Sequence, residues 1–377
     1  MPSVPAFSEP LHVGRPNIAD PERFLELARE ALDRRWLSND GPLVRELESA
    51  IADRLGVKHC IAITNGTIAL EIAIRALGLT GEVIVPSFTF VATPHALQWQ
   101  GITPVFADID PATHCLDPES VRALITERTT GIIGVHLWGV PAPVDELSAI
   151  AQEHGLQLMF DAAHAFGVSI GDRMIGAFGR AEVLSFHATK FFNSIEGGAI
   201  VTDDDELAAR TRLMRNFGFA GEDNVVYEGT NGKMTEIAAA MGLANLAALD
   251  EVVEVNRRNY LAYRREFLDI PGVSILEVDR NAESNHQYVV AIVDESCAVS
   301  RDDILSGLRA HNVLARRYFW PGAHRMEPYR TLDPRAADHL PHTERIAGQV
   351  IVLPTGTAVD EAAIAIIAEI VRDAVRA

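Results

Sequence analysis

The chain has 377 residues, of which 48% are hydrophobic and 23% are charged, and its formal net charge is −19. These fractions are typical of a globular enzyme that is long enough for two domains. The acidic balance argues against nucleic acid as a partner, because nucleic acids are bound by basic surfaces. No apolar run approaches the roughly 18 residues of a membrane span, and the N-terminus lacks the pattern of a signal peptide.

The spacing of the cysteines bears on the redox compartment and on metal binding. Three cysteines (Cys60, Cys115 and Cys297) lie far apart and form no metal-ligand or disulfide pattern. Such spacing indicates a reducing compartment and no metal site. We therefore expect a cytoplasmic protein without a membrane span.

The first 20 residues contain four prolines and little periodicity, so we expect an extended arm. Residues 21 to 35 and 43 to 54 carry apolar side chains at helical spacing. From about residue 57 to residue 204, short apolar runs alternate with helical patterns, which predicts a mostly parallel sheet with helices on both faces. Seven runs are predicted to be strands: Lys58–Ile63, Val83–Pro86, Pro104–Asp108, Gly131–His136, Leu156–Phe160, Val183–Phe186 and Ala199–Thr202.

The last third of the chain has a different texture. Thr235–Phe267 is predicted to be one long helix that leads away from the sheet. Beyond it, Gln287–Val293 is typical of a strand, and Arg301–His311 and Glu361–Val375 are typical of helices. We expect a large domain over residues 1–245, including the arm, and a smaller α+β domain over residues 246–377.

Two polar residues in the middle of the chain follow predicted strands. Asp161 closes the run Leu156–Phe160, and Lys190 closes the segment Ser185–Lys190. Ligands of α/β proteins bind at the carboxyl ends of strands. Pyridoxal phosphate needs a lysine that bonds to its aldehyde and an acid that keeps its ring nitrogen protonated. Either residue alone is weak evidence, because such lysines are usually solvated and such aspartates often form turns.

A phosphate site is predicted upstream. Thr64–Thr67 join a strand to the helical run Ile68–Ile74, and such a turn presents free N–H groups at the positive end of a helix dipole. The glycine patterns of a P-loop or a dinucleotide fingerprint are absent, and a simple helix cap is an equally good interpretation of the turn alone. Ser185 could reach the same phosphate. Phe90 is our candidate for stacking on a cofactor ring, although Phe88 is equally plausible on spacing.

Together these segments resemble the DegT/StrS family of nucleotide-sugar aminotransferases. The resemblance runs from Trp36 to the C-terminus and rests on five segments: Thr64–Thr67, Pro86–Phe90, Asp161–Ala165, Ser185–Lys190 and Glu196–Ala199. It implies a fold-type I, aspartate aminotransferase-like α/β fold, with a mostly parallel seven-stranded sheet and a smaller C-terminal α+β domain. It also implies pyridoxal 5'-phosphate as cofactor and a homodimer with shared active sites.

The resemblance assigns roles to individual residues. It makes Lys190 the covalent lysine and Asp161 the partner of the ring nitrogen, with His164 at the ring hydroxyl. Gly66, Thr67 and Ser185 would hold the phosphate, Phe90 would stack on the ring, and Asn231 would reach the partner subunit's cofactor phosphate. Gly232 and Lys233 stand where the family commonly has an aromatic residue and an arginine, and lysine lacks the planar fork of arginine.

The substrate side is less determined. His324 lies where the family often has a histidine near the sugar, and Tyr318 belongs to the same segment. His187 is expected near the lysine, either as a proton shuttle or as a structural hydrogen-bonding residue. An anionic substrate needs local cations that offset the net charge, and the pairs Arg257–Arg258 and Arg316–Arg317 are candidates.

The resemblance implies amino transfer from L-glutamate to a nucleotide-linked keto sugar in deoxyaminosugar biosynthesis, for an antibiotic or a surface glycan. A dTDP-4-keto-6-deoxy-D-glucose substrate aminated at carbon 4 is favoured over a 3-keto sugar or a GDP or UDP sugar. Two other classes stay open: a non-catalytic regulatory protein that binds the cofactor, and a dehydratase. Dehydratase relatives carry histidine at the position of Lys190, which favours amino transfer here.

Overall fold

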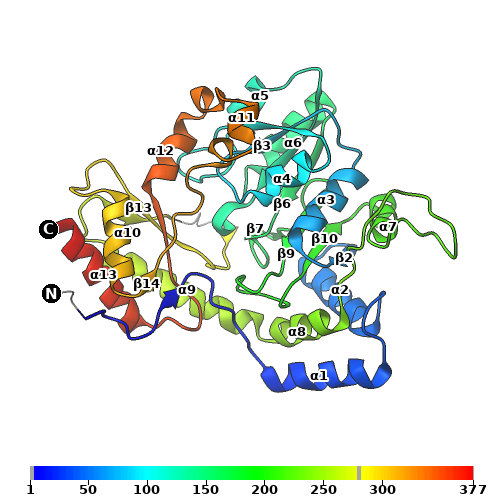
Figure 1. Ribbon diagram of the computed structural model, residues 1–377, viewed down its shortest axis with the longest axis horizontal. Coiled ribbons are helices and arrows are strands. Elements are labelled where there is room, and N and C mark those ends of the chain that lie inside the picture. Colours follow the sequence, from blue (N-terminus) through cyan, green and yellow to red (C-terminus); the bar gives the residue numbers. More distant parts are fainter. Residues whose placement is uncertain (1–3, 278–281, 377) are drawn as a thin grey trace.

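The centre of the molecule is a seven-stranded sheet, seen in a computed structural model that describes residues 4–277 and 282–376 (Figure 1). Its strand order is β2-β10-β9-β6-β5-β3-β4, and β10 runs antiparallel to both neighbours while all other pairs are parallel. The strands are β2 (His59–Ile63), β3 (Glu82–Pro86), β4 (Thr103–Ala107), β5 (Thr129–Val135), β6 (Gln157–Asp161), β9 (Ala181–Ser185) and β10 (Gly198–Thr202). All seven predicted strands are confirmed, each within two residues of its expected bounds.

Both faces of the sheet are covered, and successive strand residues divide between two hydrophobic cores. In β2, Cys60 and Ala62 belong to one core, and Ile61 and Ile63 belong to the other. This alternation follows from the two-residue period of a strand. Helices α2 (Pro42–Leu55), α6 (Val144–His154) and α8 (Glu236–Ala247) supply the first core, and α3 (Gly66–Ala76), α4 (Ala92–Gln98) and α7 (Asp205–Met214) supply the second.

The expectation of one long helix over Thr235–Phe267 was wrong. The structure has two helices there, α8 and α9 (Leu249–Phe267), separated by Ala248 at φ −107° and ψ 14°. α8 packs against α2 and α1 (Pro21–Arg34), whereas α9 packs against α13 (Glu361–Arg376). No proline or glycine stands at Ala248, so the sequence gives no local signal for the break. The break instead lets the two helices pack against different parts of the molecule.

The C-terminal region has a core of its own, as the predicted α+β domain requires. An antiparallel sheet of β11 (Val273–Ile275), β13 (Val289–Val293) and β15 (Val350–Leu353) packs with α9, α10 (Arg301–Ala310) and α13. These helices lie together on the left of Figure 1. The segment with α11 (Tyr329–Leu332) and α12 (Pro341–Gln349) returns to the large sheet, where Tyr329 and Leu340 join the second core. The domain boundary near residue 245 stays a prediction.

The N-terminal arm connects the two regions. Its β1 (Leu11–His12) pairs with β14 (Val313–Leu314), and the Asn17 side chain donates to the Phe191 carbonyl at 3.0 Å. The arm therefore fixes the loop that carries Lys190, while its first three residues lie outside the described part of the chain. The remaining elements are α5 (Pro118–Ala123), β7 (Ser169–Ile170), β8 (Arg173–Met174), β12 (Ala282–Glu283) and the 3-10 turns Leu137–Gly139, Ala323–Arg325 and Ala336–His339.

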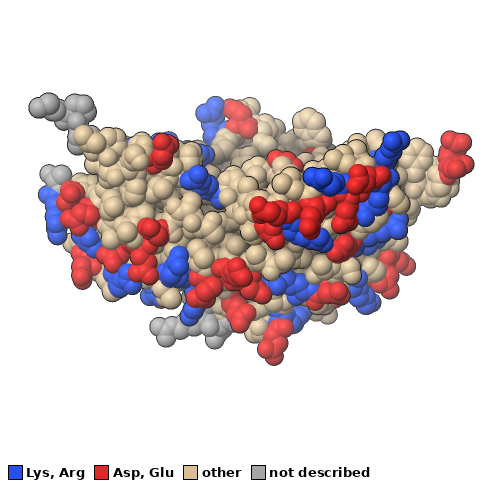
Figure 2. All heavy atoms as spheres, turned by 90° about the horizontal axis from the view of Figure 1, so that it is seen from below, with Lys and Arg blue, Asp and Glu red and all other residues tan. Residues whose placement is uncertain are grey.

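Surface charge is mixed on the side where α1 lies. Figure 2 shows acidic and basic side chains interspersed there, and the basic ones do not gather into one continuous area. Within residues 4–277 and 282–376, no helix has the length and apolar character to cross a membrane. The same residues contain no cluster of three or more side chains suited to hold a metal ion.

Candidate active site

A cavity of about 650 Å³ opens beyond the carboxyl ends of the parallel strands. Asp161 and Ser185 are the last residues of β6 and β9, and Gly66 begins the helix that follows β2, so all three reach this edge. The cavity brings together nine residues to which the sequence analysis gave a site role, and the candidate cation Arg316: the nine are Gly66, Thr67, Phe90, Asp161, His164, Ser185, His187, Lys190 and Tyr318. Asn231 and His324 do not line it.

Lys190 lies in the loop between β9 and β10. Its Nζ donates a hydrogen bond to Tyr288 Oη at 3.4 Å. Burial lowers the pKa of Lys190 to about 8, and the nearby Asp161 carboxylate limits the shift. An amine with that pKa is partly neutral near physiological pH, and only the neutral amine is a nucleophile or a base.

Asp161 is buried and held by two donors. Its Oδ2 accepts from Thr93 Oγ1 at 2.8 Å, and its Oδ1 accepts from the Ala163 N–H at 3.1 Å. Burial raises the pKa of Asp161 above its usual range, while both hydrogen bonds and the charge of Lys190 oppose the rise. A carboxylate fixed in this way is pre-oriented toward one partner, as a functional site requires.

His164 is held as a neutral hydrogen-bond donor. Its Nδ1 accepts from the Trp138 N–H at 3.3 Å, which assigns the ring proton to Nε2. The ring stacks with Trp138 and Phe319 at interplanar angles of 20° and 13°. Burial, assisted by the charge of Lys190, brings the pKa of His164 well below its usual range. The side chain can therefore donate from Nε2 without carrying a charge.

The strand-to-helix turn at α3 has the form of an anion site. The Asn65 side chain caps the helix by accepting from the Ile68 N–H at 2.9 Å. A Cβ atom on Gly66 would lie 3.0 Å from Ser185 Cβ and 3.2 Å from Ser185 Oγ. Glycine therefore keeps open the space between the helix N-terminus and the serine hydroxyl. Backbone N–H groups, a helix dipole and a hydroxyl are suitable ligands for a phosphate.

The structure distinguishes the two aromatic candidates. Phe90 lines the cavity with 57% of its surface exposed, whereas Phe88 is fully buried. Phe88 packs edge-on against Trp138 and Phe319. Only Phe90 is free to contact a ligand ring.

His187 and Tyr318 stand at the same cavity. His187 Nδ1 lies 2.8 Å from Thr189 Oγ1, and its Nε2 lies 3.5 Å from Glu196 Oε1. Tyr318 stacks with Phe319 at an interplanar angle of 19°. Both residues line the cavity, and their roles toward a substrate stay predictions.

His324 requires a correction. The side chain is 3% exposed, and both ring nitrogens are occupied, Nδ1 by Ser87 Oγ and Nε2 by Glu344 Oε1, each at 2.6 Å. It joins α12 to the end of β3 and does not reach the cavity. A structural hydrogen-bonding role replaces the expected position near the sugar.

Asn231 lies on the surface, in an isolated bridge with Asn216. The adjacent Gly232 carbonyl accepts from the Thr64 N–H at 2.8 Å, so the segment is held beside the α3 turn. Asn231 does not line the cavity of its own chain, and its predicted action on a partner subunit stays a prediction.

Sequence reasoning missed several residues of the site. Thr93 does not line the cavity but donates to Asp161, and nothing in the sequence linked the two residues. Tyr288 was interpreted as part of a strand. Arg316 was named only as one of several basic candidates, and Phe319 was not singled out at all.

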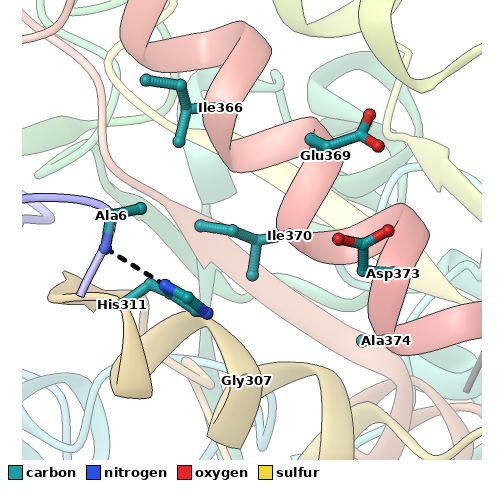
Figure 3. Close-up of a pocket in the computed structure, with 8 residues that line it drawn as sticks. All are labelled: Ala6, Gly307, His311, Ile366, Glu369, Ile370, Asp373 and Ala374. Carbon is teal, nitrogen blue, oxygen red and sulfur yellow. Dashed lines mark hydrogen bonds between the residues drawn. The ribbon is translucent and has the colours of Figure 1, made fainter. Parts of the chain in front are cut away.

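A second hollow lies between α10 and α13 in the C-terminal region (Figure 3). It has a volume of about 400 Å³ and is lined by apolar side chains such as Ile366 and Ile370 beside Glu369 and Asp373. His311 Nδ1 accepts from the Ala6 N–H at 3.1 Å and is thus engaged by the arm. Its described lining includes two acids but no lysine, whereas a lysine, an acid and a helix N-terminus meet in the first cavity, which is therefore the candidate active site.

Comparison with known proteins agrees with this geometry. Residues 19–372 match the DegT/DnrJ/EryC1/StrS aminotransferase family. The chain belongs to this family. The predicted family and fold are confirmed, the chain is an aminotransferase, and the aminotransferases of this family depend on pyridoxal phosphate.

Among curated relatives, the chain is 36% identical over 350 residues to the dTDP-4-amino-4,6-dideoxy-D-glucose transaminase of Escherichia coli, covering 93% of this chain and 94% of the relative. It is 35% identical over 358 residues to the GDP-perosamine synthase of Caulobacter vibrioides, covering 93% and 95%.

Solved structures of the family superpose closely on this chain. The crystal structure of DesI in the presence of its TDP-sugar product aligns with a TM-score of 0.94 and 51% identity, covering 99% of this chain and 94% of DesI. PseC of Helicobacter pylori, an aminotransferase of pseudoaminic acid biosynthesis, aligns with a TM-score of 0.91 and 27% identity, covering 98% and 100%.

Proposed function

We propose that this family member uses pyridoxal phosphate to transfer an amino group from L-glutamate to a nucleotide-linked keto sugar. The carrying observation is the meeting of Lys190, Asp161 and the Gly66–Ser185 gap in one cavity. These groups match the three parts of pyridoxal phosphate that need a partner, namely its aldehyde, its ring nitrogen and its phosphate. The groups lie at or beyond the ends of three strands, β2, β6 and β9, so the fold itself assembles the set.

The cavity residues fit the cofactor. Lys190 would bond to it, Asp161 would face its ring nitrogen, and His164 Nε2–H would donate to its ring hydroxyl. Phe90 would lie against the ring, while Gly66, Thr67 and Ser185 would hold the phosphate. When bound, the cofactor supplies a ring that withdraws electrons from the reacting carbon.

Lys190 also provides the proton transfer. An amine whose pKa is lowered to about 8 exists in both protonation states near neutral pH. The Lys190 amine can therefore accept a proton from the α-carbon of the amino donor and release it again later in the same half-reaction. The same amine acts in the half-reaction with glutamate and in the half-reaction with the keto sugar. Loss of Lys190 therefore stops both half-reactions.

The nucleotide sugar is proposed to be dTDP-4-keto-6-deoxy-D-glucose, aminated at carbon 4 in a deoxyaminosugar pathway. The dTDP-4-amino-4,6-dideoxy-D-glucose transaminase activity of the E. coli relative and the TDP-sugar product of DesI support this choice. The similarity to a GDP-perosamine synthase keeps a GDP sugar as the alternative, and 3-keto and UDP sugars belong in the same test. A non-catalytic regulatory protein is disfavoured, because Lys190, Asp161 and Ser185 all face one cavity.

The test is incubation of the purified protein with L-glutamate and a panel of dTDP, GDP and UDP keto sugars, read by mass spectrometry. Amination of the dTDP 4-keto sugar is expected, together with an absorbance change on adding glutamate alone. A glutamate response without any aminated sugar would refute the nucleotide-sugar part. No response to glutamate would refute L-glutamate as the amino donor.

A separate experiment tests the cofactor. Borohydride reduction should fix pyridoxal phosphate to the peptide that contains Lys190. The chain contains only three lysines, Lys58, Lys190 and Lys233, so peptide mapping resolves the site without ambiguity. Fixation on Lys58 or Lys233 would refute the assignment.

A homodimer that acts in the cytoplasm is also proposed. The loop after α7 projects from the body of the molecule on the right of Figure 1. It exposes four apolar side chains, between 40% and 57% of their surface: Phe217, Phe219, Val225 and Val226. Apolar side chains gathered on a projecting segment favour association with a second chain. Asn231 follows this loop, which supports its predicted action on the partner's site.

A further inference from the structure

The charges around the cavity are sparse. Among the described lining residues, Lys190 and Arg316 are the only lysine and arginine side chains. The acids of the lining are Asp161, beside Lys190, and Glu196, whose carboxylate lies 3.5 Å from His187 Nε2. With a net charge of −19 for the whole chain, an anionic substrate depends on such local cations.

Arg316 differs from the other basic candidates. Arg317 pairs with Asp302 at 3.2 Å, and Arg257 pairs with Glu254 at 3.4 Å. Within the described part of the chain, the Arg316 guanidinium makes neither an ion pair nor a hydrogen bond. Its donors are therefore available to a ligand.

The guanidinium is nevertheless held in place. Its central carbon lies 5.0 Å from the centre of the Tyr318 ring. A cation–π contact of this kind restrains the guanidinium without using its N–H donors. Tyr318 in turn stacks on Phe319, which stacks on His164. Arg316 is thus attached to the same aromatic stack that forms the cavity wall.

The exposed position of Arg316 indicates which anionic group of the substrate it contacts. Arg316 is an exposed residue of the lining, whereas Lys190 lies deeper. In a hexose aminated at carbon 4, the diphosphate is attached at carbon 1, across the ring from the reacting carbon. When carbon 4 is at Lys190, the diphosphate therefore lies toward the cavity mouth. We propose that Arg316 binds the diphosphate of the nucleotide sugar, an inference that rests on the proposed function.

Binding of dTDP to the cofactor-loaded enzyme tests this directly, because dTDP carries the diphosphate but cannot react. Affinities are measured by calorimetry for the wild type and for Arg316→Gln, Arg316→Lys and Arg317→Gln. UDP and GDP are run in parallel, and the tightest ligand of the three is carried forward. The unfolding temperature and the absorbance of the bound cofactor confirm that each variant is intact.

We expect Arg316→Gln to weaken binding at least about tenfold, equivalent to about 1.4 kcal/mol. Arg316→Lys should retain part of the affinity, because it keeps the charge but loses the planar fork. Arg317→Gln, which removes an equal charge next door, should stay within about twofold. The salt dependence of binding should also flatten in Arg316→Gln, because one charge contact with phosphate is lost.

The glutamate half-reaction distinguishes the diphosphate from the donor carboxylate. Its rate and its KM for L-glutamate should be unchanged in Arg316→Gln. Weaker glutamate binding with normal dTDP binding would overturn the proposal and assign Arg316 to the carboxylate. Equal dTDP affinity in the wild type and Arg316→Gln would overturn it while leaving the proposed function intact. A wild type that binds none of the three nucleotides would refute both.

Discussion

At the scale of single residues, the cavity holds an amine and a carboxyl group whose proton affinities are both displaced by burial. Burial lowers the pKa of Lys190 from its ordinary 10.5 to about 8. Because the folded chain then binds fewer protons than the unfolded chain between these values, the Lys190 contribution opposes folding below pH 8 and is relieved as the pH rises toward 10.5. The neutral amine is thereby populated at a pH where a surface lysine is charged.

Amine labelling of the cofactor-free protein tests this pKa. Acetic anhydride reacts with neutral amines, so labelling of Lys190 should rise through a midpoint near pH 8. Lys58, with 62% of its side chain exposed, provides the reference peptide in the same sample. A Lys190 midpoint near 10.5 would show that burial does not shift this amine.

Asp161 gives a second prediction at this scale. Asp161→Asn keeps the shape but removes the charge that would hold a ring nitrogen protonated. The glutamate half-reaction should slow by at least about a hundredfold, with a much smaller loss of cofactor affinity. Near-normal turnover would reduce Asp161 to a turn residue.

Thr93 offers a graded control for the same carboxylate. Thr93→Val removes the hydroxyl that donates to Asp161 at 2.8 Å and should slow the half-reaction about five- to tenfold, the effect of one hydrogen bond. Thr93→Ser keeps the donor and should stay near the wild type. Equal losses in both variants would indicate a packing effect instead of a hydrogen-bonding one.

At the scale of elements, α2 depends on a residue from α8. Its N-cap, Gly41, has no side chain, and the buried Glu236 carboxylate instead accepts from the Leu43 and Val44 N–H groups at 3.0 and 2.9 Å. A Cβ atom on Gly41 would clash with that carboxyl group. A glycine before the helix and an acid 193 residues beyond Leu43 therefore act as one cap.

Glu236→Ala should destabilise the protein by about 3 kcal/mol, because two buried donors lose a charged acceptor. Glu236→Gln should cost less, since one oxygen still accepts. The midpoint of urea unfolding, measured on the cofactor-free protein, checks both. Glu254→Ala on the surface of α9 is the matched control and should stay within about 0.5 kcal/mol; an equally small change in Glu236→Ala would contradict the capping role.

At the scale of the whole molecule, the shared site predicts complementation between two inactive chains. Lys190→Ala and Asn231→Ala proteins should each be inactive, provided that the Asn231 contact is essential. Mixing equal amounts under subunit exchange makes half of the dimers hybrids, each with one intact site, so about a quarter of wild-type specific activity should return. Verified hybrids without activity above the parents would show that Asn231 does not serve the partner's site.

The sequence by itself determined the seven strands and the location of Asp161, Ser185 and Lys190 at or beyond their ends. Strand periodicity is a local property, and apolar runs between helical patterns leave few alternatives to a covered, mostly parallel sheet. Because the carboxyl ends of parallel strands lie at one edge of a sheet, these residues are expected together at that edge. Family resemblance added their roles, which no spacing could supply.

Tertiary contacts decided the rest. Phe88 and Phe90 lie on one short segment, and only packing against Trp138 and Phe319 buries the first and leaves the second in the cavity. His324 meets Ser87 across 237 residues, a contact that no local pattern encodes. Arg317 pairs with Asp302, whereas the adjacent Arg316 has no ion-pair partner within the described part of the chain. Side-chain direction and charge pairing depend on residues far away in the chain, so they become visible only when the chain is folded.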